Sequence, residues 1–495
     1  MDGSGNPWLR MDIGIRGDRI AALGRLSDSA AATVIDAGDR LVTPGFIDVH
    51  SHAAGGLTRA ELRQARPLLA QGVTTVVVNP DGGGPVDLEA QRLELEKGGV
   101  GPNVALLIGH GSVRRAVMRS ENRAPTPDEL EQMRGLVRRA MEHGAFGLSS
   151  GLFYTPGSFA TTEEVIELAR VAAAFGGLYT SHIRDEADYG IGVVAAVQEV
   201  IRIAEEAKTI GIVSHMKALG PDNWGLSMAS TMRLDQARDR GIQVFADQYP
   251  YEASSTSLRA ALLPGGIELP EPDRSAAARE TMTPEERASG AALERTVREN
   301  IRRRGGAASL QIASYGPDRS LEGKNMQQIA EARGVPPEAA ALALMAAGNA
   351  SIVSFNMSEA DIRQIMTRPY TMVSSDGGLV PMGSGQPHPR NYGAFARRLA
   401  VYVRERGVTS LEAAVRSMTS LPAGVFGLTD RGVIRAGAIA DLAIFDPAAV
   451  RDRATYTDPH QLSEGMAWVL VNGVPVIADG TFGTALPGKV LAKRR

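Results

Sequence analysis

The chain has 495 residues, no cysteine and a formal net charge of −3, with 43% hydrophobic and 22% charged residues. This length exceeds one small core, and the composition is that of an ordinary soluble globular protein without a membrane span. The lack of cysteine excludes disulfides and thiolate catalysis, and the charge gives no reason to expect a nucleic acid or a membrane as partner.

Both ends of the chain predict short antiparallel strands. Residues 9–43 alternate apolar and polar side chains, and 432–446 and 466–482 have the same pattern. We expect residues 1–43 and 430–495 to pair into one small β-sandwich. The start, MDGSGNPWLR, has neither the charged nor the apolar region of a signal peptide, which favours a cytoplasmic protein. A periplasmic or secreted protein stays open if a leader has been removed.

The middle of the chain, residues 44–429, alternates strand-like and helix-like segments. Helix-like segments such as 126–144 and 161–177 open on Thr, carry acidic residues in the first turn and end at Gly. Between them lie eight apolar runs, which predict a (β/α)8 TIM-type barrel with strands near 46–50, 73–79, 104–109, 145–150, 177–182, 210–215, 242–247 and 370–375.

One interval, 258–310, is too long for an ordinary connection between barrel elements. It carries LLPGGIELPEPDR and a charged, helix-like stretch. We interpret it either as an inserted lid over the barrel mouth or as a solvated surface excursion.

Four of the eight histidines and one aspartate stand where predicted strands end: His50, His52, His182, His215 and Asp376. Strands of a parallel barrel deliver their catalytic groups from their C-terminal ends. Neutral imidazoles with a carboxylate are the ligand set of a hydrolytic zinc ion. A single histidine is more often a satisfied core residue, but four at strand ends predict a metal site.

A series of motifs runs along nearly the whole chain in a fixed order: TPGFIDVHSH, GVTTVVVNPDG, LIGHGSVRRAVM, YTSHIRDE, SHMKALGPDNWG, DQYPYEASST, SSDG, HPRNYGAFAR and GVIRAGAIADLAIFDP. In these motifs the chain resembles the amidohydrolase superfamily, and within it the D-aminoacylases (N-acyl-D-amino-acid deacylases). The resemblance implies a metal-dependent barrel with a small β-sandwich and an insertion covering the site. It also implies hydrolysis of the amide between an acyl group and a D-amino acid.

The chain departs from the family pattern at two places. Asp81, in VVVNPDGGG, stands where many family members have a metal-ligating cysteine, and a carboxylate is a harder donor than a thiolate. Family members also usually have one more strand before the DGSGNPW segment, where Met1 stands here. We expect Zn²⁺ in one tight site, with a second, weaker site open, and Asp81 leaves Mn²⁺ or Co²⁺ open as well. Because GLSSG (147–151) holds no lysine, no carbamylated lysine is expected.

The resemblance also implies roles for the residues at the strand ends. His182, His215 and Asp81 are expected to bind the tighter metal ion. His50 and His52 point the same way from one strand, and they either complete that shell or hold a second ion. Asp376 is the expected general base, which takes a proton from the attacking water and passes it to the leaving nitrogen. The alternative for Asp376 is a purely structural carboxylate.

The free carboxylate of such a substrate needs positive and hydroxyl groups around it. The resemblance points to five residues for this role: Tyr154, Lys217, Tyr249, Ser255 and Arg390. Lys217 lies two residues beyond His215 and so faces the same side, and an arginine fork suits a carboxylate. The alternatives are a surface ion pair for Arg390 and core packing for the tyrosines.

The expected partner is therefore a small molecule with a free carboxylate, cleaved to a carboxylate and a D-amino acid. A related alternative is a peptidase of the same superfamily that cleaves dipeptides with a D- or β-linked residue. A cyclic amidase or lactonase is less favoured, because it has no use for a carboxylate-binding set. A non-catalytic scaffold is disfavoured by the complete set of ligand side chains. The preferred side chain, the metal and the oligomeric state stay open.

Overall fold

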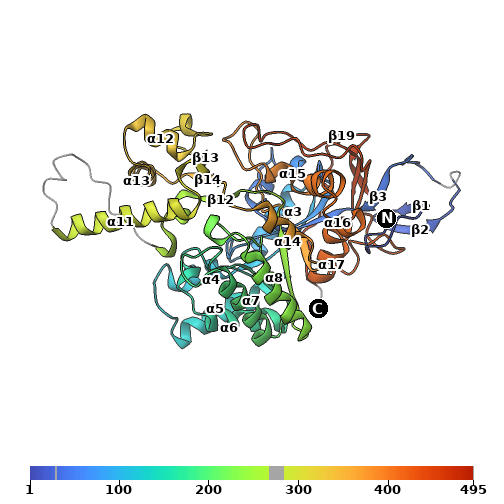
Figure 1. Cartoon of the computed structure of the whole chain (residues 1–495). Helices are drawn as coiled ribbons and strands as arrows, with labels where there is room; N and C mark the ends of the chain where they lie inside the picture. The colour runs from blue at the N-terminus through green and yellow to red at the C-terminus, as the bar shows by residue number, and fades with distance from the viewer. Residues whose placement is uncertain (28–30, 267–283, 494–495) are drawn as a thin grey trace.

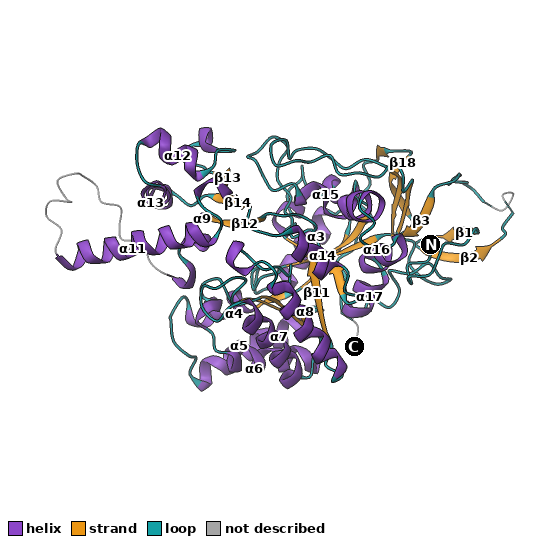
Figure 2. Ribbon diagram, in the orientation of Figure 1, coloured by secondary structure: helices purple, strands orange, loops and turns teal. Residues whose placement is uncertain are grey.

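A computed structural model describes residues 1–27, 31–266 and 284–493. Figure 1 shows a central α/β part with a β-rich part at one end and a mainly helical part at the other. Figure 2 shows the strands of the central part surrounded by helices. Among the described residues, no helix is both long enough and apolar enough to cross a bilayer.

The centre of the molecule is a ring of parallel strands. Its sheets have the orders β4-β5-β6 and β15-β11-β10-β9-β8-β7. The ring closes between β15 and β4, where the backbone N–H of Asp376 donates to the carbonyl of His50 at 2.9 Å. The predicted (β/α)8 barrel is therefore confirmed. Its strands are β4 (Phe46–Ser51), β5 (Val73–Val78), β6 (Asn103–Leu106) with β7 (Ile108–Gly109), β8 (Gly147–Gly151), β9 (Leu178–His182), β10 (Gly211–Val213), β11 (Val244–Gln248) and β15 (Thr371–Val373).

These strands are apolar because both of their faces are covered. Every residue of β5, with the sequence VTTVVV, is buried, as is typical of a parallel strand under helices. The helices begin where the sequence predicts. Thr126 and Glu129 form a reciprocal capping box at the start of α5 (Pro127–Glu142), and Thr161 caps α6 (Thr162–Ala174).

The other helices of the barrel follow its strands in chain order. They are α1 (Ala54–Leu57), α2 (Arg66–Leu69), α3 (Leu88–Gly98), α4 (His110–Met118), α7 (Val193–Ala207), α8 (Leu226–Asp239), α14 (Glu359–Met366), α15 (Arg390–Arg397), which continues into a π-helical segment (Arg398–Glu405), α16 (Leu411–Met418) and α17 (Ser420–Phe426).

A second sheet combines the two ends of the chain. Its order is β19-β18-β17-β16-β3, and β3 (Leu41–Pro44) pairs antiparallel with β16 (Leu442–Phe445). A separate hairpin precedes β3. The expected boundaries 1–43 and 430–495 stay a prediction. The remaining strands are β1 (Asp12–Arg16), β2 (Arg19–Gly24), β17 (Met466–Val471), β18 (Val474–Ala478) and β19 (Thr481–Phe482).

Between β11 and β15 the chain forms a three-stranded sheet, β12-β14-β13, with helices around it. This insertion has a hydrophobic core of its own, which extends from Leu258 to Ile352. The predicted interval 258–310 covers only part of that core, and within it residues 267–283 lie outside the described part of the chain. The elements of the insertion are β12 (Ser254–Ser257), α9 (Leu258–Leu262), α11 (Pro284–Arg303), β13 (Leu310–Ser314), α12 (Met326–Arg333), α13 (Pro337–Ala347) and β14 (Ser351–Ser354).

Candidate metal centre and active site

A cavity of about 820 Å³ lies at the carboxyl ends of the barrel strands, between the barrel and the insertion. All the residues predicted for the site line this cavity except His50, which is buried beside it. The barrel supplies the histidines, Asp81 and Asp376, and β12 of the insertion supplies Ser255. The sequence motifs therefore meet at one place in the fold.

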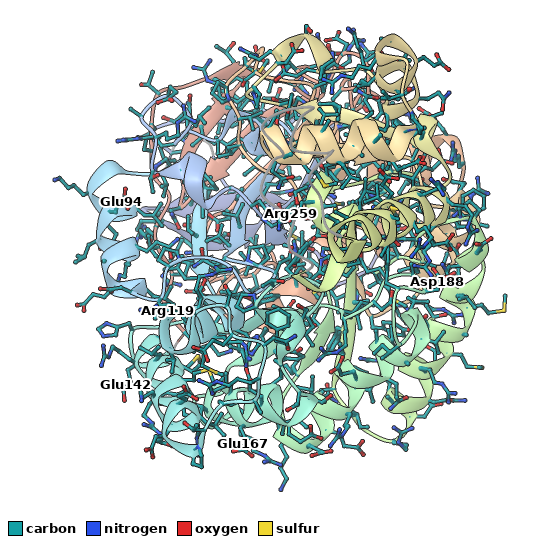
Figure 3. The ribbon with its side chains drawn as sticks, turned by 90° about the vertical axis from the view of Figure 1, so that its left-hand side faces the viewer. Glu94, Arg119, Glu142, Glu167, Asp188 and Arg259 are labelled. Atoms are coloured by element: carbon teal, nitrogen blue, oxygen red, sulfur yellow. The ribbon has the colours of Figure 1, made fainter. Side chains whose placement is uncertain are left out.

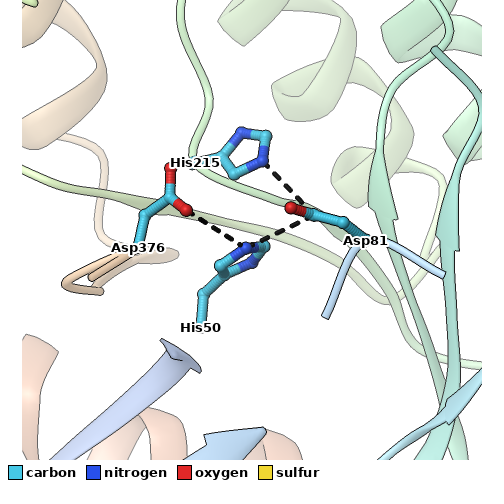
Figure 4. Close-up of side chains that lie close together, drawn as sticks. All are labelled: His50, Asp81, His215 and Asp376. Atoms are coloured by element: carbon cyan, nitrogen blue, oxygen red, sulfur yellow. Dashed lines mark ion pairs between the residues drawn. The ribbon is translucent and has the colours of Figure 1, made fainter. Parts of the chain in front are cut away.

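Asp81 is the residue around which the histidines gather. It lies just after β5 with a φ of 55°. Its Oδ1 lies 3.3 Å from His50 Nε2, 3.4 Å from His215 Nε2 and 4.0 Å from His182 Nδ1. Its Oδ2 lies 3.4 Å from His52 Nε2. Figure 4 shows the Asp81 carboxylate between His50 and His215.

Asp376 faces the same histidines from the opposite side (Figure 4). Its Oδ1 lies 3.1 Å from His52 Nε2 and 3.6 Å from His50 Nε2. Its Oδ2 lies 2.7 Å from Arg390 Nη1. One oxygen of the expected general base thus faces the histidine cluster, and Arg390 holds the other.

The cluster has the properties of a metal site. Both ring nitrogens of His50, Oδ1 of Asp81 and Nε2 of His182 are buried without a hydrogen-bond partner. Such atoms are costly unless something binds them. The ligand atoms of His50, Asp81, His215 and Asp376 lie within 4.8 Å of one another, as do those of His182, Glu186 and His215. Imidazole and carboxylate donors of this kind fit a divalent ion such as Zn²⁺.

The carboxylates and imidazoles of the cluster shift one another's pKa values. Burial opposes ionisation of Asp81, but His50 and His215 hold the pKa of that carboxyl well below its usual range. Burial also opposes ionisation of Asp376, and Arg390 and His215 hold its pKa well below the usual range. Burial lowers the pKa of His182 to about 4. At neutral pH the carboxylates are therefore charged and His182 is neutral, as metal binding requires. Against the effect of burial, the neighbouring carboxylates raise the pKa of His52 to about 9 and that of His215 to about 10, so a metal ion would displace the protons of these two rings.

Glu186 is a member of the site that the sequence did not identify. It is buried four residues after His182, within YTSHIRDE. Its Oε1 accepts from Lys217 Nζ at 2.6 Å and lies 3.1 Å from His215 Nδ1, and its Oε2 lies 3.8 Å from His182 Nε2. An acidic residue close behind a predicted ligand was the available signal, but the path of the loop decides its position.

Lys217 reaches the site from beside His215, as its position in the sequence predicts. Its Nζ lies 2.6 Å from His215 Nδ1 in addition to its bond with Glu186. Partners of this kind fix the ring orientation of a histidine that binds a metal. The charge of Lys217 is therefore already paired, and its expected contact with a substrate carboxylate stays a prediction.

The remaining substrate-binding candidates surround Arg390. Its guanidinium is buried over the ring of Tyr249, 4.7 Å from the ring centre, and its Nη2 donates to the carbonyl of Ser255 at 3.5 Å. The hydroxyl of Tyr154 lies 3.2 Å from that of Thr256 in the insertion. These residues thus share one wall of the cavity.

Two buried residues outside the predicted set hold this wall and the ligands in place. Asp48 accepts from the backbone N–H groups of Ser375 and His50, which ties the end of β15 to β4. Burial raises the pKa of Asp48 to about 6. His388 accepts the backbone N–H of Arg390 through Nδ1 at 3.0 Å.

Comparisons with known proteins agree with this geometry. The sequence of residues 33–477 matches the protein family described as "Amidohydrolase family". The chain is 37% identical to a D-aminoacylase of Alcaligenes xylosoxydans xylosoxydans, over 100% of this chain and 96% of that protein. It is 37% identical to an N-acyl-D-glutamate deacylase of the same organism, over 100% of this chain and 95% of that protein.

A solved structure has the same fold. It is the N-acyl-D-glutamate deacylase of Bordetella bronchiseptica, complexed with zinc and a phosphonate inhibitor that mimics the tetrahedral intermediate of the reaction. It is similar to this chain with a TM-score of 0.83 and 37% identity, covering 99% of this chain and 97% of that one.

Proposed function

Because this chain belongs to the amidohydrolase family, we propose that it hydrolyses the amide bond of N-acyl-D-amino acids and releases a carboxylate and a free D-amino acid. One observation carries the proposal. Asp81 and four histidines form a cluster with the donor atoms that a metal ion needs, and the buried cation Arg390 lines the same cavity. A hydrolytic centre next to a carboxylate-binding group is what this substrate requires.

The metal ion would be held by the side chains that surround Asp81. They are His50, His52, Asp81, His182 and His215. When bound, a divalent ion lowers the pKa of water and polarises the scissile carbonyl. We assign Zn²⁺ first, in one tight site, and Mn²⁺ or Co²⁺ next, because Asp81 provides oxygen in place of sulfur.

Asp376 would move the proton. Its Oδ1 faces His50 and His52, whereas its Oδ2 is paired with Arg390. Oδ1 is therefore the atom that takes a proton from the attacking water and delivers it to the leaving nitrogen. The contact between the end of β15 and β4, which closes the ring of strands, keeps this carboxylate within reach of the ligand cluster.

Arg390 would bind the α-carboxylate of the substrate. Its Nε is buried and has no hydrogen-bond partner, so the guanidinium retains a donor for a ligand. Tyr249 supports the guanidinium from one face. We assign the hydroxyls of Tyr154 and Ser255 as further donors, and Lys217 as a positive charge on the metal side.

A substrate panel tests the proposal. Purified enzyme, loaded with Zn²⁺, Mn²⁺ or Co²⁺ or treated with a chelator, is offered N-acetyl-D-amino acids, their L-enantiomers and dipeptides with a D-residue at the C-terminus. We expect metal-dependent release of D-amino acids from the N-acetyl compounds, and little reaction with the L-enantiomers. Hydrolysis of the dipeptides alone would instead support a peptidase.

A further inference from the structure

A third buried cation faces the cavity, and the mechanism described above does not use it. Arg304 follows α11 directly and is only 2% exposed, yet it lines the same cavity as the ligand cluster. Figure 3 looks onto the end of the molecule that carries α11, with Asp188 and Arg259 labelled. Arg304 comes from the insertion, so it belongs to the wall opposite the barrel strands.

Arg304 is only partly satisfied by its neighbours. Its Nε donates to the hydroxyl of Tyr189 at 2.8 Å and to the carbonyl of Ala261 at 3.3 Å. Its Nη1 is buried without a hydrogen-bond partner. Within 1–27, 31–266 and 284–493, no carboxylate lies within ion-pair distance of this guanidinium. A buried charge without a counter-ion among these residues is costly, which points to an anion that binds here.

The other cations nearby differ from Arg304 in this respect. Lys217 is paired with Glu186, and Arg390 with Asp376. Arg303, the preceding residue, is one-quarter exposed at its side chain and lies 3.4 Å from Asp188 on the outer surface. Of these four cations, Arg304 is therefore the one without a carboxylate partner among the described residues, and it is the arginine of this helix end that lines the cavity.

The surroundings of Arg304 suit a second carboxylate. Tyr189, which positions Arg304, packs against Phe153, whose ring lies 5.8 Å from that of the predicted metal ligand His182. The nearby strand β12 lines the cavity with hydroxyl groups, and β14 adds one more. A cation and hydroxyl donors that line one cavity with the ligand cluster suit the recognition of an anionic group.

We propose that Arg304 binds a second carboxylate of the substrate, in addition to the α-carboxylate at Arg390. This inference rests on the proposed deacylase activity and specifies its substrate class as N-acyl-D-amino acids with an extra carboxylate. That carboxylate is carried either by the side chain, as in glutamate, or by the acyl group, as in succinyl. The curated relatives leave the choice open, since a D-aminoacylase and an N-acyl-D-glutamate deacylase are equally similar to this chain.

Two matched pairs of substrates test the proposal and separate the two sources. N-acetyl-D-glutamate is compared with N-acetyl-D-glutamine, and N-succinyl-D-leucine with its succinamide analogue. We expect the wild type to prefer the acid in one pair by roughly 10–100-fold in kcat/KM, as is typical of one charged hydrogen-bonding partner. Arg304→Met should abolish that preference, and Arg304→Lys should retain part of it. Equal rates within both pairs, or an unchanged preference in Arg304→Met, would overturn the proposal.

Controls separate recognition from a structural role. Arg303→Met removes the neighbouring charge outside the cavity and should leave the acid preference unchanged. If Arg304→Met lowers the rates with acid and amide alike, together with the melting temperature, Arg304 only supports the insertion and the proposal is wrong. If neither these compounds nor N-acetyl-D-leucine is hydrolysed, the deacylase assignment has failed. The same pairs then serve as ligands in thermal denaturation, where only an acid-specific stabilisation that Arg304→Met abolishes supports the proposal.

Discussion

Replacement of Asp81 by alanine should remove most of the tightly bound metal while the barrel stays folded. The Asp81 carboxylate lies within 4.0 Å of a ring nitrogen on each of the four clustered histidines. No other carboxylate in the described residues has that many of these contacts. Its loss therefore removes the group that links His50 and His52 to His182 and His215. The histidines themselves keep their places at the ends of the strands.

The expected size of the effect follows from that position. A partner that only orients a ligand typically contributes ~10–100-fold to metal affinity. Asp81 is in direct reach of the cluster, so its removal should weaken binding by more than about 100-fold. If the wild type binds with a Kd of about 1 nM, dialysis against about 10 nM free metal leaves it roughly nine-tenths occupied, whereas Asp81→Ala should fall below about a tenth.

Elemental analysis with matched variants makes the test specific. Asp81→Cys restores a metal-binding donor and should retain Zn²⁺, because thiolate is a good zinc ligand. Asp87→Ala, which removes a carboxylate that caps α3 outside the cluster, should keep the wild-type metal content. An unchanged metal content in Asp81→Ala, with an unchanged melting temperature, would refute the role of Asp81 as a ligand.

Two other predictions concern catalysis and recognition. Asp376→Asn should keep the fold and the metal content but lower turnover by on the order of 10²–10⁴-fold, because it removes the proton acceptor, and more than about a tenth of wild-type activity would contradict this. Arg390→Ala should cost about 2–5 kcal/mol of transition-state stabilisation with N-acyl-D-amino acids, seen as a lower kcat/KM, and far less with the corresponding C-terminal amides, since these lack the α-carboxylate. Equal losses with acid and amide would exclude a carboxylate clamp.

The clustering of the histidines and Asp376 was predictable because strand ends in a parallel barrel share one rim. An apolar run that stops at a histidine or an aspartate therefore fixes the place of that side chain to within a few ångströms. His182 ends β9 and His215 lies two residues after the adjacent strand β10, and their ring nitrogens approach to 2.9 Å. Side chains two residues apart on an extended chain point the same way, which predicts that Lys217 faces the site as His215 does. Its Nζ lies 2.6 Å from His215 Nδ1.

Glu186 was not predictable in this way, because it lies beyond the strand. The loop after β9 takes its path from Asp185, whose carboxylate accepts the backbone N–H groups of Ala187, Gly190 and Gly192. No periodic pattern in the sequence encodes that arrangement. The partner of Lys217 consequently became visible only in the structure, and with it the reason why the lysine charge is already paired.

The insertion shows the same limit on a larger scale. Its sheet pairs Ser254 with Ser354 and Ser257 with Ser351, although these residues are about a hundred positions apart in the chain. Each of the two strands has four residues, SSTS in β12 and SIVS in β14. Neither strand has the apolar alternation that predicts a sheet, so the predicted interval ended near residue 310. The pairing that it omitted brings Ser351 to the cavity wall. Motifs at strand ends thus predicted the ligand cluster, whereas part of the cavity wall depends on distant segments that fold together in the insertion.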